Sequence, residues 1–304
     1  MTGMPPRPAP TPASPQPESP LPHVLWIGGP PGAGKTTVAR LLARRHGLRW
    51  YNADAHTWEH RDRAIAAGHP GAVRWEALPR EERWSAPPAE LLAMSLHHER
   101  GRMIVDDLRA LPATPLTVAE GTPVTPPVID AFAGADTGTG TGGRAVWLLP
   151  SVEVQRARLH ERDLGLPPGT HTLYRSLAGE IESEVAEYGA RKLVVDGRSS
   201  VARTVAAVEK IFADALRAGP VAATATERGR LLRYANRATV SQYEAFFARP
   251  WSPGNAGTTV LAFACECGRA GCEEDVRVTV ADFPPPPDTA TSPPLLAPGH
   301  LPEG

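Results

Sequence analysis

Residues 29–36 read GPPGAGKT, and this stretch decides the fold because it matches the pattern G-x-x-x-x-G-K-[ST] at every fixed position. Its glycines let the backbone wrap tightly and point N–H groups inward, so the loop and the start of a following helix form a cradle for an anion. Lys35 would bring a positive charge to the β- and γ-phosphates of a nucleotide, and the Thr36 hydroxyl would lie beside a magnesium ion. We therefore expect Lys35 to be exposed to phosphate and not packed in a core.

The residues on either side have the patterns that such a loop needs. Residues 23–28 (HVLWIG) are a short apolar run typical of a buried strand, and Lys35–His46 carries its apolar residues on one helical face. A glycine-rich turn that binds nothing would need neither Lys35 nor Thr36, so we predict a site for ATP with magnesium. Its residues are Gly29, Pro30, Pro31, Gly32, Ala33, Gly34, Lys35, Thr36 and Thr37.

Short apolar runs alternate with helical patterns through the first two thirds of the chain. The expected strands are residues 23–28, 48–52, 117–119, 145–149 and 193–195, and the expected helices are residues 35–46, 90–111, 152–162, 174–188 and 201–216. Short, fully apolar strands between helices indicate a parallel sheet that is covered on both faces. The predicted fold class is therefore α/β, a three-layer sandwich.

We divide the chain into four parts. Residues 1–20 contain eight prolines and read as a disordered tail, and residues 284–304 read the same way. Residues 21–217 form the predicted nucleotide-binding domain. Residues 226–283 form a small second unit, which reads as a helix followed by a β-hairpin that contains cysteines.

Composition narrows the classes of function. A formal net charge of −1 over 304 residues argues against nucleic acid or a membrane surface as a partner. No apolar run approaches the ~20 residues that a membrane span needs, and the proline-rich start does not read as a secretory signal. Three cysteines within residues 265–272 do not make an extracellular disulfide framework, so we expect a cytoplasmic location.

The stretch GGPPGAGKTTVARLLA resembles the P-loop kinases of small molecules, the adenylate-kinase-like and shikimate-kinase-like group. The resemblance spans residues 21–217 in the order of elements, and it is specific at residue level in the phosphate loop. It implies a P-loop NTPase fold and an ATP-dependent phosphotransferase acting on a small-molecule acceptor. The chain has no N-K-x-D motif for guanine, which favours ATP over GTP.

Two carboxylates at predicted strand ends are candidate catalytic residues. Asp54 follows the second strand, and ligands of open α/β sheets bind at the carboxyl ends of strands. The resemblance implies that an acid there contacts the acceptor, so Asp54 would accept a hydroxyl proton; the alternative is a helix cap. Glu120 ends the third strand and would act on magnesium through water or orient a nucleophile. Asp106 and Asp107 are the rivals for this role, but their segment reads as a helix, which favours Glu120.

The sequence RLHER resembles the R-x-x-x-R that opens the lid of adenylate-kinase-like enzymes. Arg158 and Arg162 are four residues apart and would share a helix face. The resemblance implies that one packs on the base and the other contacts phosphate, with residues 164–172 as a short lid. A solvated basic face paired with Glu161 explains the same pattern equally well.

The segment that would hold the acceptor is residues 55–88. Its tryptophans and arginines suit an anionic or aromatic acceptor, and they also suit a small helical cap with its own core. The residues are Trp58, Trp75, Trp84, Arg61, Arg63, Arg74 and Arg80. Two functions stay open, a kinase or a nucleotide-dependent ATPase or regulator whose C-terminal unit binds a protein partner. An acceptor pocket that is filled, or that lacks polar groups next to the loop, would favour the regulator.

Cys265, Cys267 and Cys272 form the pattern C-x-C-x4-C. Residues two apart on a strand point to the same face, so the first two thiols would converge and the third would return across a glycine turn. Three thiolates could hold zinc, but structural zinc usually has four ligands, and no histidine or fourth cysteine is near in the sequence. A carboxylate, a water or a partner chain would then complete the site. The candidate carboxylates are Glu266, Glu273 and Asp275.

Two further interpretations of the cysteines stay open, free thiols in a hairpin and a redox-active disulfide. The run CECG followed by C and VRVTV also resembles a recurring small bacterial module, and this resemblance implies no particular role.

Overall fold

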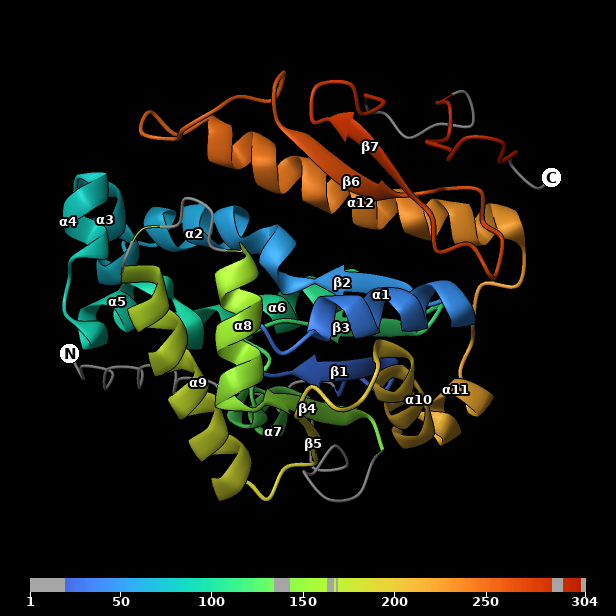
Figure 1. Cartoon of the computed structure of the whole chain (residues 1–304), viewed down its shortest axis with the longest axis horizontal. Helices are drawn as coiled ribbons and strands as arrows, with labels where there is room; N and C mark the ends of the chain where they lie inside the picture. The colour runs from blue at the N-terminus through green and yellow to red at the C-terminus, as the bar shows by residue number, and fades with distance from the viewer. Residues whose placement is uncertain (1–19, 134–142, 163–166, 168, 286–291, 302–304) are drawn as a thin grey trace, which may run out of the picture.

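The computed structural model describes residues 20–133, 143–162, 167, 169–285 and 292–301. Its centre is a parallel sheet of five strands in the order β2-β3-β1-β4-β5 (Figure 1). The strands are β1 (Val24–Gly28), β2 (Arg49–Asn52), β3 (Thr117–Glu120), β4 (Ala145–Pro150) and β5 (Lys192–Val195). The predicted α/β class with a parallel sheet is confirmed. The predicted N-terminal tail lies outside the described residues except for Pro20.

Helices cover both faces of the sheet, and each layer buries its own apolar cluster. One layer consists of α1 (Lys35–His46), α10 (Val201–Ile211) and α11 (Ala213–Ala218). The other consists of α6 (His97–Ala110), α7 (Pro126–Ala133) and α9 (Gly169–Glu187). Leu25 and Ile27 of β1 belong to the first cluster, and Val24 and Trp26 belong to the second. This alternation follows from the two-residue period of a strand, so the sheet is the middle of three layers.

A helical cap follows β2. It consists of η1 (Ala53–His56), α2 (Thr57–Ala66), α3 (Pro70–Ala77), α4 (Arg80–Trp84) and α5 (Pro88–Ser95). The prediction of one helix over residues 90–111 is wrong, because the chain breaks between α5 and α6 at Leu96, whose φ is 60°. Leu96 is fully buried against Ala64 and Ala72. Packing inside the cap therefore overrides the helical periodicity of the segment.

The C-terminal unit consists of α12 (Ala225–Phe247) and the antiparallel hairpin of β6 (Val260–Ala264) and β7 (Asp275–Thr279). A capping box between Thr224 and Glu227 fixes the start of α12. Val240, Phe263 and Phe283 bury a small core between the helix and the hairpin. The predicted helix with a cysteine-containing hairpin is confirmed. In Figure 1, α12 lies along β2 and the start of the cap, so the unit is joined to one edge of the sheet.

Residues 292–301, which the sequence analysis assigned to a C-terminal tail, lie against the hairpin. The backbone N–H of Glu266 donates to the Leu295 carbonyl oxygen at 2.8 Å, and the N–H of Leu295 donates to the Glu266 carboxylate at 2.9 Å. Ala297 is buried in this contact. The tail interpretation missed this segment because prolines and glycines dominate it and leave no apolar period to detect.

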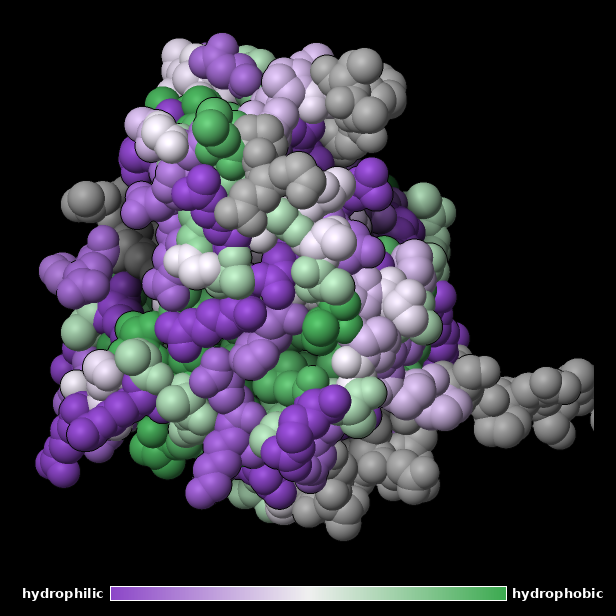
Figure 2. Space-filling model, turned by 90° about the vertical axis from the view of Figure 1, so that its right-hand side faces the viewer, coloured by the Kyte–Doolittle hydropathy of each residue, from purple (hydrophilic) through white to green (hydrophobic). Residues whose placement is uncertain are grey.

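Two arginines of α1 join the domain that contains the five-stranded sheet to the C-terminal unit. Arg40 and Arg44 of α1 each lie 2.7 Å from the Asp275 carboxylate of β7. On the face shown in Figure 2, hydrophilic residues alternate with small hydrophobic patches. Within the described part of the chain, none of the helices has the length and apolar character that crossing a membrane requires.

Candidate functional site

The phosphate loop connects β1 to α1 at the carboxyl edge of the sheet. Gly29 has a φ of 134°, and a Cβ there would lie 2.2 Å from the Leu148 carbonyl oxygen, so only glycine fits. The N–H of Ala33 donates to the Pro30 carbonyl oxygen at 3.2 Å, and Gly34 is the N-cap residue of α1. Among the described residues, no side chain caps the N-terminus of α1. Its first N–H groups are therefore available to an anion.

Lys35 is 5% exposed, which corrects the expectation of an exposed side chain. Its Nζ donates to the Pro30 carbonyl oxygen at 3.0 Å and to the Thr122 hydroxyl at 3.4 Å. The loop therefore wraps around the ammonium group and holds it. Lys35 and Thr36 nevertheless line a cavity of about 440 Å³, where oxygens of a ligand could replace these two acceptors.

Glu120 ends β3, paired in register with Ile27 of β1 and Asn52 of β2. Its side chain is fully buried, and the Thr36 and Trp50 side chains lie close enough to lower its pKa, although neither carboxylate oxygen has a hydrogen bond of good geometry among the described residues. The pKa of Glu120 is raised to about 7, chiefly by burial and also by the Asp54 charge, against the lowering effects of Lys35, Thr36 and Trp50. A buried carboxylate without a partner is costly, so Glu120 is suited to a cation or a donor that arrives with a ligand.

Asp54 lies on η1, directly after β2, and it is exposed to the same cavity as Lys35. Its charge acts on Glu120 and also on Arg100, where it partly offsets the lowering of the arginine pKa by burial. The Asn52 side chain accepts a hydrogen bond from the Asp54 N–H at 2.9 Å. Asn52, and not Asp54, thus caps this turn, which leaves the Asp54 carboxylate free of a capping role.

The rival carboxylates Asp106 and Asp107 lie on α6. Asp107 accepts hydrogen bonds from Tyr51 and Arg63 at 2.6 Å each, and His60 Nε2 lies 2.7 Å from it. Burial raises the pKa of Asp107, but these three partners outweigh it and lower the pKa to about 2. Asp107 therefore ties the cap to β2 and α6, and it is not the acid beside the phosphate loop.

The helix α8 (Val152–Arg162) lies against the phosphate loop. Arg158 Nη1 donates to the Gly32 carbonyl oxygen, and Gln155 Nε2 donates to the Pro31 carbonyl oxygen, both at 3.0 Å. Arg158 therefore contacts the backbone of the phosphate loop; its contact with a base or a phosphate stays a prediction. The side chain of Arg162 lies outside the described part of the chain.

The predicted lid, residues 164–172, is described only in part. Residues 164–166 and 168 lie outside the described residues, and residues 169–172 form the first turn of α9 instead of a loop. Beside Arg158, a cavity of about 250 Å³ opens between the phosphate loop and the segment that follows β5; Thr37 and Ser199 line it.

A cavity of about 440 Å³ extends from the phosphate loop into the helical cap. Lys35 and Thr36 lie at the loop, and tryptophans line the cap. Trp58, Trp75 and Trp84 supply the aromatic surface, and Asp54, Arg61, His97, Arg100 and Thr122 supply polar groups. Gln242 of α12 also lines the cavity, so the C-terminal unit contributes to its wall. The cavity combines a polar region at the phosphate loop with an aromatic region in the cap, as small-molecule sites often do.

Arg61 is the most deeply buried cation of the cap part of this cavity, with 4% exposure. Its Nη2 donates to the Met94 carbonyl oxygen at 2.9 Å, and its Nε and Nη1 have no partner among the described residues. The guanidinium lies 4.7 Å from the Trp75 ring centre and 5.7 Å from that of Trp58. Burial lowers the pKa of Arg61 to about 9, so it keeps its charge at neutral pH. An anion with an aromatic or apolar body would accept hydrogen bonds from the unpartnered N–H groups of Arg61 and would pack against the two tryptophan rings.

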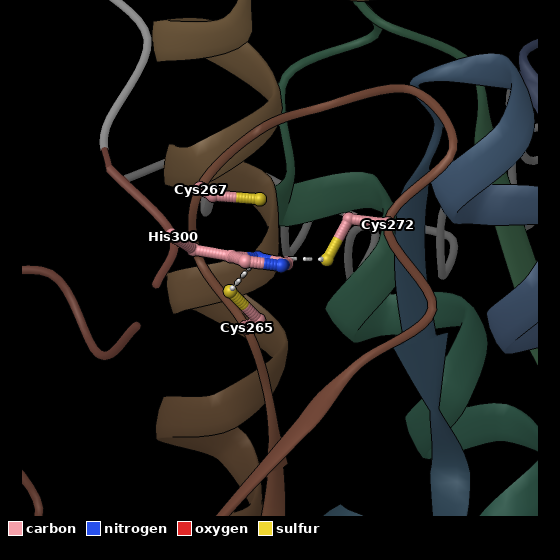
Figure 3. A group of neighbouring side chains, drawn as sticks. All are labelled: Cys265, Cys267, Cys272 and His300. Carbon is pink, nitrogen blue, oxygen red and sulfur yellow. Dashed lines mark hydrogen bonds between the residues drawn. The ribbon is translucent and has the colours of Figure 1, made fainter. Parts of the chain in front are cut away.

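The three cysteines come together at the end of the hairpin, and His300 joins them (Figure 3). His300 is distant from the cysteines in the sequence and was not among the expected fourth ligands; it reaches them because residues 292–301 fold back onto the hairpin. The proposed carboxylate ligands have other partners. Glu266 pairs with Arg233 at 2.6 Å, Glu273 with Arg45 at 3.3 Å, and Asp275 with Arg40 and Arg44.

Solved structures similar to this chain are small-molecule kinases. A shikimate kinase from Acinetobacter baumannii in complex with shikimate is 18% identical, with 64% of this chain and 93% of that chain covered and a TM-score of 0.36. A sugar kinase from Janibacter sp. is 19% identical, with 64% and 96% covered and a TM-score of 0.33. A deoxyadenosine kinase from M. mycoides is 12% identical, with 63% and 99% covered and a TM-score of 0.38.

The chain matches no protein-family model, and no curated protein matches it. At these identities and TM-scores the matches say nothing about activity, which has to be inferred from the side chains of the site.

Several residues of the site had no signal in the sequence. Thr122 follows a predicted strand end, where ligand-binding loops lie, and this position could have pointed to it. Gln155 and His97 lie on helices for which the sequence did not predict which face points toward the site. Gln242 lies 184 residues beyond Trp58 in the chain. It nevertheless reaches the cavity, where its side-chain oxygen accepts a hydrogen bond from the backbone N–H of Trp58 at 3.0 Å. No local pattern encodes such a contact.

Proposed function

We propose that this chain is an ATP-dependent phosphotransferase that phosphorylates a small anionic acceptor with an aromatic or apolar body. The observation that supports this most strongly is the cavity that runs from Lys35 and Thr36 to Trp58, Arg61 and Trp75. A regulator that only switches with its nucleotide needs no open space beside the phosphates, whereas a kinase must hold a second molecule there.

The nucleotide would lie on the phosphate loop. The uncapped N–H groups of α1 and the ammonium group of Lys35 would bind its phosphates, and Arg158 would add a second positive charge from α8. The cavity of about 250 Å³ lined by Thr37, Arg158 and Ser199 is large enough to take part of the base and sugar.

A magnesium ion fits the residues beside the loop. The Thr36 hydroxyl and the Glu120 carboxylate, which lie close to each other, would supply the oxygen donors that this ion prefers. When bound, the ion would neutralise charge on the phosphates. Glu120 would lose its proton on meeting that charge, since its raised pKa reflects burial without a cation.

The acceptor would lie in the cap. Arg61 would bind its anionic group with the two N–H groups that lack partners, and the tryptophans would cover its apolar body. Asp54, exposed to the cavity, would orient the acceptor hydroxyl and take its proton. Gln242 would close the wall from α12, which gives the C-terminal unit a role in the site without a protein partner.

The test is a screen of small anionic metabolites for those that raise ADP release above the rate with water alone. Arg61→Gln should raise the KM of any acceptor found by about 10- to 100-fold, the effect of losing a charged hydrogen bond, with the KM for ATP unchanged. Arg74→Gln is the matched control, because Arg74 lies on the outside of the cap and pairs with Glu90. An acceptor whose KM responds equally to both variants, or a protein that only hydrolyses ATP, would contradict the proposal.

A further inference from the structure

Four metal-ligating side chains converge at the end of the hairpin. Cys265 and Cys267 follow β6, Cys272 lies in the turn before β7, and His300 comes from the C-terminal segment (Figure 3). One ligand atom from each residue lies within 4.8 Å of those of the other three. Cys265 and Cys267 are buried, and Cys272 is partly buried. All three cysteines are free thiols, and His300 is partly exposed.

The backbone brings His300 to this place without help from its ring. Leu295 pairs with Glu266, and the chain then turns over residues 297–300, where the N–H of His300 donates to the Ala297 carbonyl oxygen at 3.0 Å. Gly299, with a φ of 78°, follows Pro298, so the sequence APGH supplies the proline and glycine that a type II turn requires. As a result His300 Nδ1 lies 3.4 Å from Cys265 Sγ and 3.6 Å from Cys272 Sγ.

We propose that Cys265, Cys267, Cys272 and His300 bind one structural zinc ion, which fastens the C-terminal segment to the hairpin. Thiolate and imidazole are the donors that zinc prefers, and Cys₃His is one of its usual sets. In a tetrahedron with ordinary zinc bond lengths, a sulfur and a nitrogen ligand lie about 3.6 Å apart. The two distances from His300 to the sulfurs match that separation. Four protein ligands leave no open position, so the ion would hold structure and not catalyse.

The surroundings are those of a thiolate site. The N–H of Ala297 donates to Cys265 Sγ at 3.2 Å, a contact that stabilises a charged sulfur ligand. Glu266 points the other way, into an ion pair with Arg233 and a hydrogen bond with Asn236. A disulfide would leave one thiol and His300 without a role in the same cluster, so a metal accounts for more of the arrangement.

The zinc would also supply stability that the unit otherwise lacks. A two-stranded hairpin is marginal on its own in water, and the helix α12 covers one side of this one. Residues 292–301 would be held by the metal in addition to the contacts of Leu295 and Ala297. Since Asp275 beside the cluster pairs with Arg40 and Arg44, the metal would also steady the contact with α1.

The first measurement is the metal content of the full chain purified without chelator. We expect about one zinc per chain, and after exchange with cobalt(II) we expect the absorption of a tetrahedral sulfur-rich site. Iron in place of zinc, or a reduced protein that takes up neither zinc nor cobalt(II), would overturn the proposal.

The second measurement compares variants. Cys267→Ser should lose the metal, and His300→Ala should weaken zinc binding by about 10-fold or more and speed amide hydrogen exchange in residues 292–301. The control is His98→Ala, because His98, Glu180 and Glu184 form another group of neighbouring ligand atoms on the described surface. Zinc that stays in His300→Ala with unchanged affinity, or that leaves with His98→Ala, would contradict the assignment. The cobalt(II) spectrum of the unaltered chain decides the matter even where a variant fails to fold.

Discussion

The Lys35 side chain is hydrogen-bonded to the phosphate loop of which it is part. In the structure its ammonium group already has two acceptors, Pro30 and Thr122, so binding a nucleotide exchanges these contacts for phosphate oxygens. Lys35→Ala should weaken ATP binding by about 10- to 100-fold, the range expected for a charged hydrogen bond, as measured by titration calorimetry. Circular dichroism should show the fold retained. Unchanged ATP affinity in a folded variant would exclude Lys35 from the phosphate site.

Substitutions of the two carboxylates beside the phosphate loop, Asp54 and Glu120, should change different kinetic properties. Asp54 is exposed to the cavity, so Asp54→Asn should lower kcat by about 100-fold or more, the usual contribution of a general base, with little change in ATP affinity. Glu120 is buried beside Thr36, so Glu120→Gln should raise the magnesium concentration needed for half-maximal activity. Steady-state kinetics at varied magnesium measures both. Identical effects of the two changes would argue against this division of roles.

Asp107 is a structural residue, and its stability contribution should depend on pH. Its folded pKa of about 2 lies below the ordinary value of 3.8, so its contribution is complete above about pH 4 and is lost as the pH falls toward 2. Asp107→Asn should therefore cost about 2 kcal/mol at neutral pH, and the difference from the unaltered chain should shrink in acid. Urea unfolding at several pH values tests this. Asp106→Asn, at a partly exposed neighbour whose ion pairs with Arg102 and Arg109 are open to solvent, is the control, with an expected change under about 1 kcal/mol.

At the residue scale, what the sequence predicted best was the chemistry that a local motif encodes. Thr36 and Lys35 lie where the loop pattern requires, because the motif specifies a backbone path as well as side chains. The burial of Lys35 was not predicted, since it depends on Thr122, which comes from another strand end. His300 was missed for a similar reason. It reaches Cys265 across 35 residues, through a turn whose glycine and proline were interpreted as signs of disorder.

At the scale of elements, the short apolar strands were predictable because β1 and β3 are buried along their whole length and have no competing period. The helices were predicted less well, and α5 and α6 are the clearest case. Apolar residues continue at helical spacing through Leu96, yet that residue packs into the cap with a positive φ. Because the helix breaks at Leu96, Ser95 and His97 both line the cavity. A continuous helix over residues 90–111 would place these two side chains differently.

The helix α12 makes an element-scale contribution to the site. Gln242 accepts a hydrogen bond from the N–H of Trp58 at 3.0 Å and lines the cavity beside it. Gln242→Ala should raise the KM for the acceptor by about 5- to 10-fold, the loss of roughly one hydrogen bond, and leave the KM for ATP unchanged. Ser241→Ala, a change at the exposed neighbouring residue, should alter neither. Equal KM values for the acceptor in both variants would remove α12 from the site.

At the scale of the whole molecule, the contact between α1 and β7 depends on Arg44 more than on its neighbour. The Arg44 side chain is 2% exposed and bonded to Asp275, whereas the pair of Arg45 and Glu273 is open to solvent. Arg44→Ala should lower the free energy of unfolding by about 2 kcal/mol, less than the loss of a fully buried ion pair. Arg45→Ala should cost under about 1 kcal/mol. Thermal unfolding of both variants measures the difference.

The order of the sheet has a consequence for how the chain can be shortened. The strand β2 is at one end of the five, with one side not paired to another strand, and α12 lies along it. Trp50 of β2 and Leu231 of α12 border the same small cavity. A chain cut after residue 217 would keep its phosphate loop but uncover this strand, whose open N–H and C=O groups are a template for a second molecule. We therefore expect such a fragment to self-associate. In the whole chain, α12 covers this strand edge, so it would prevent aggregation in addition to lining the cavity.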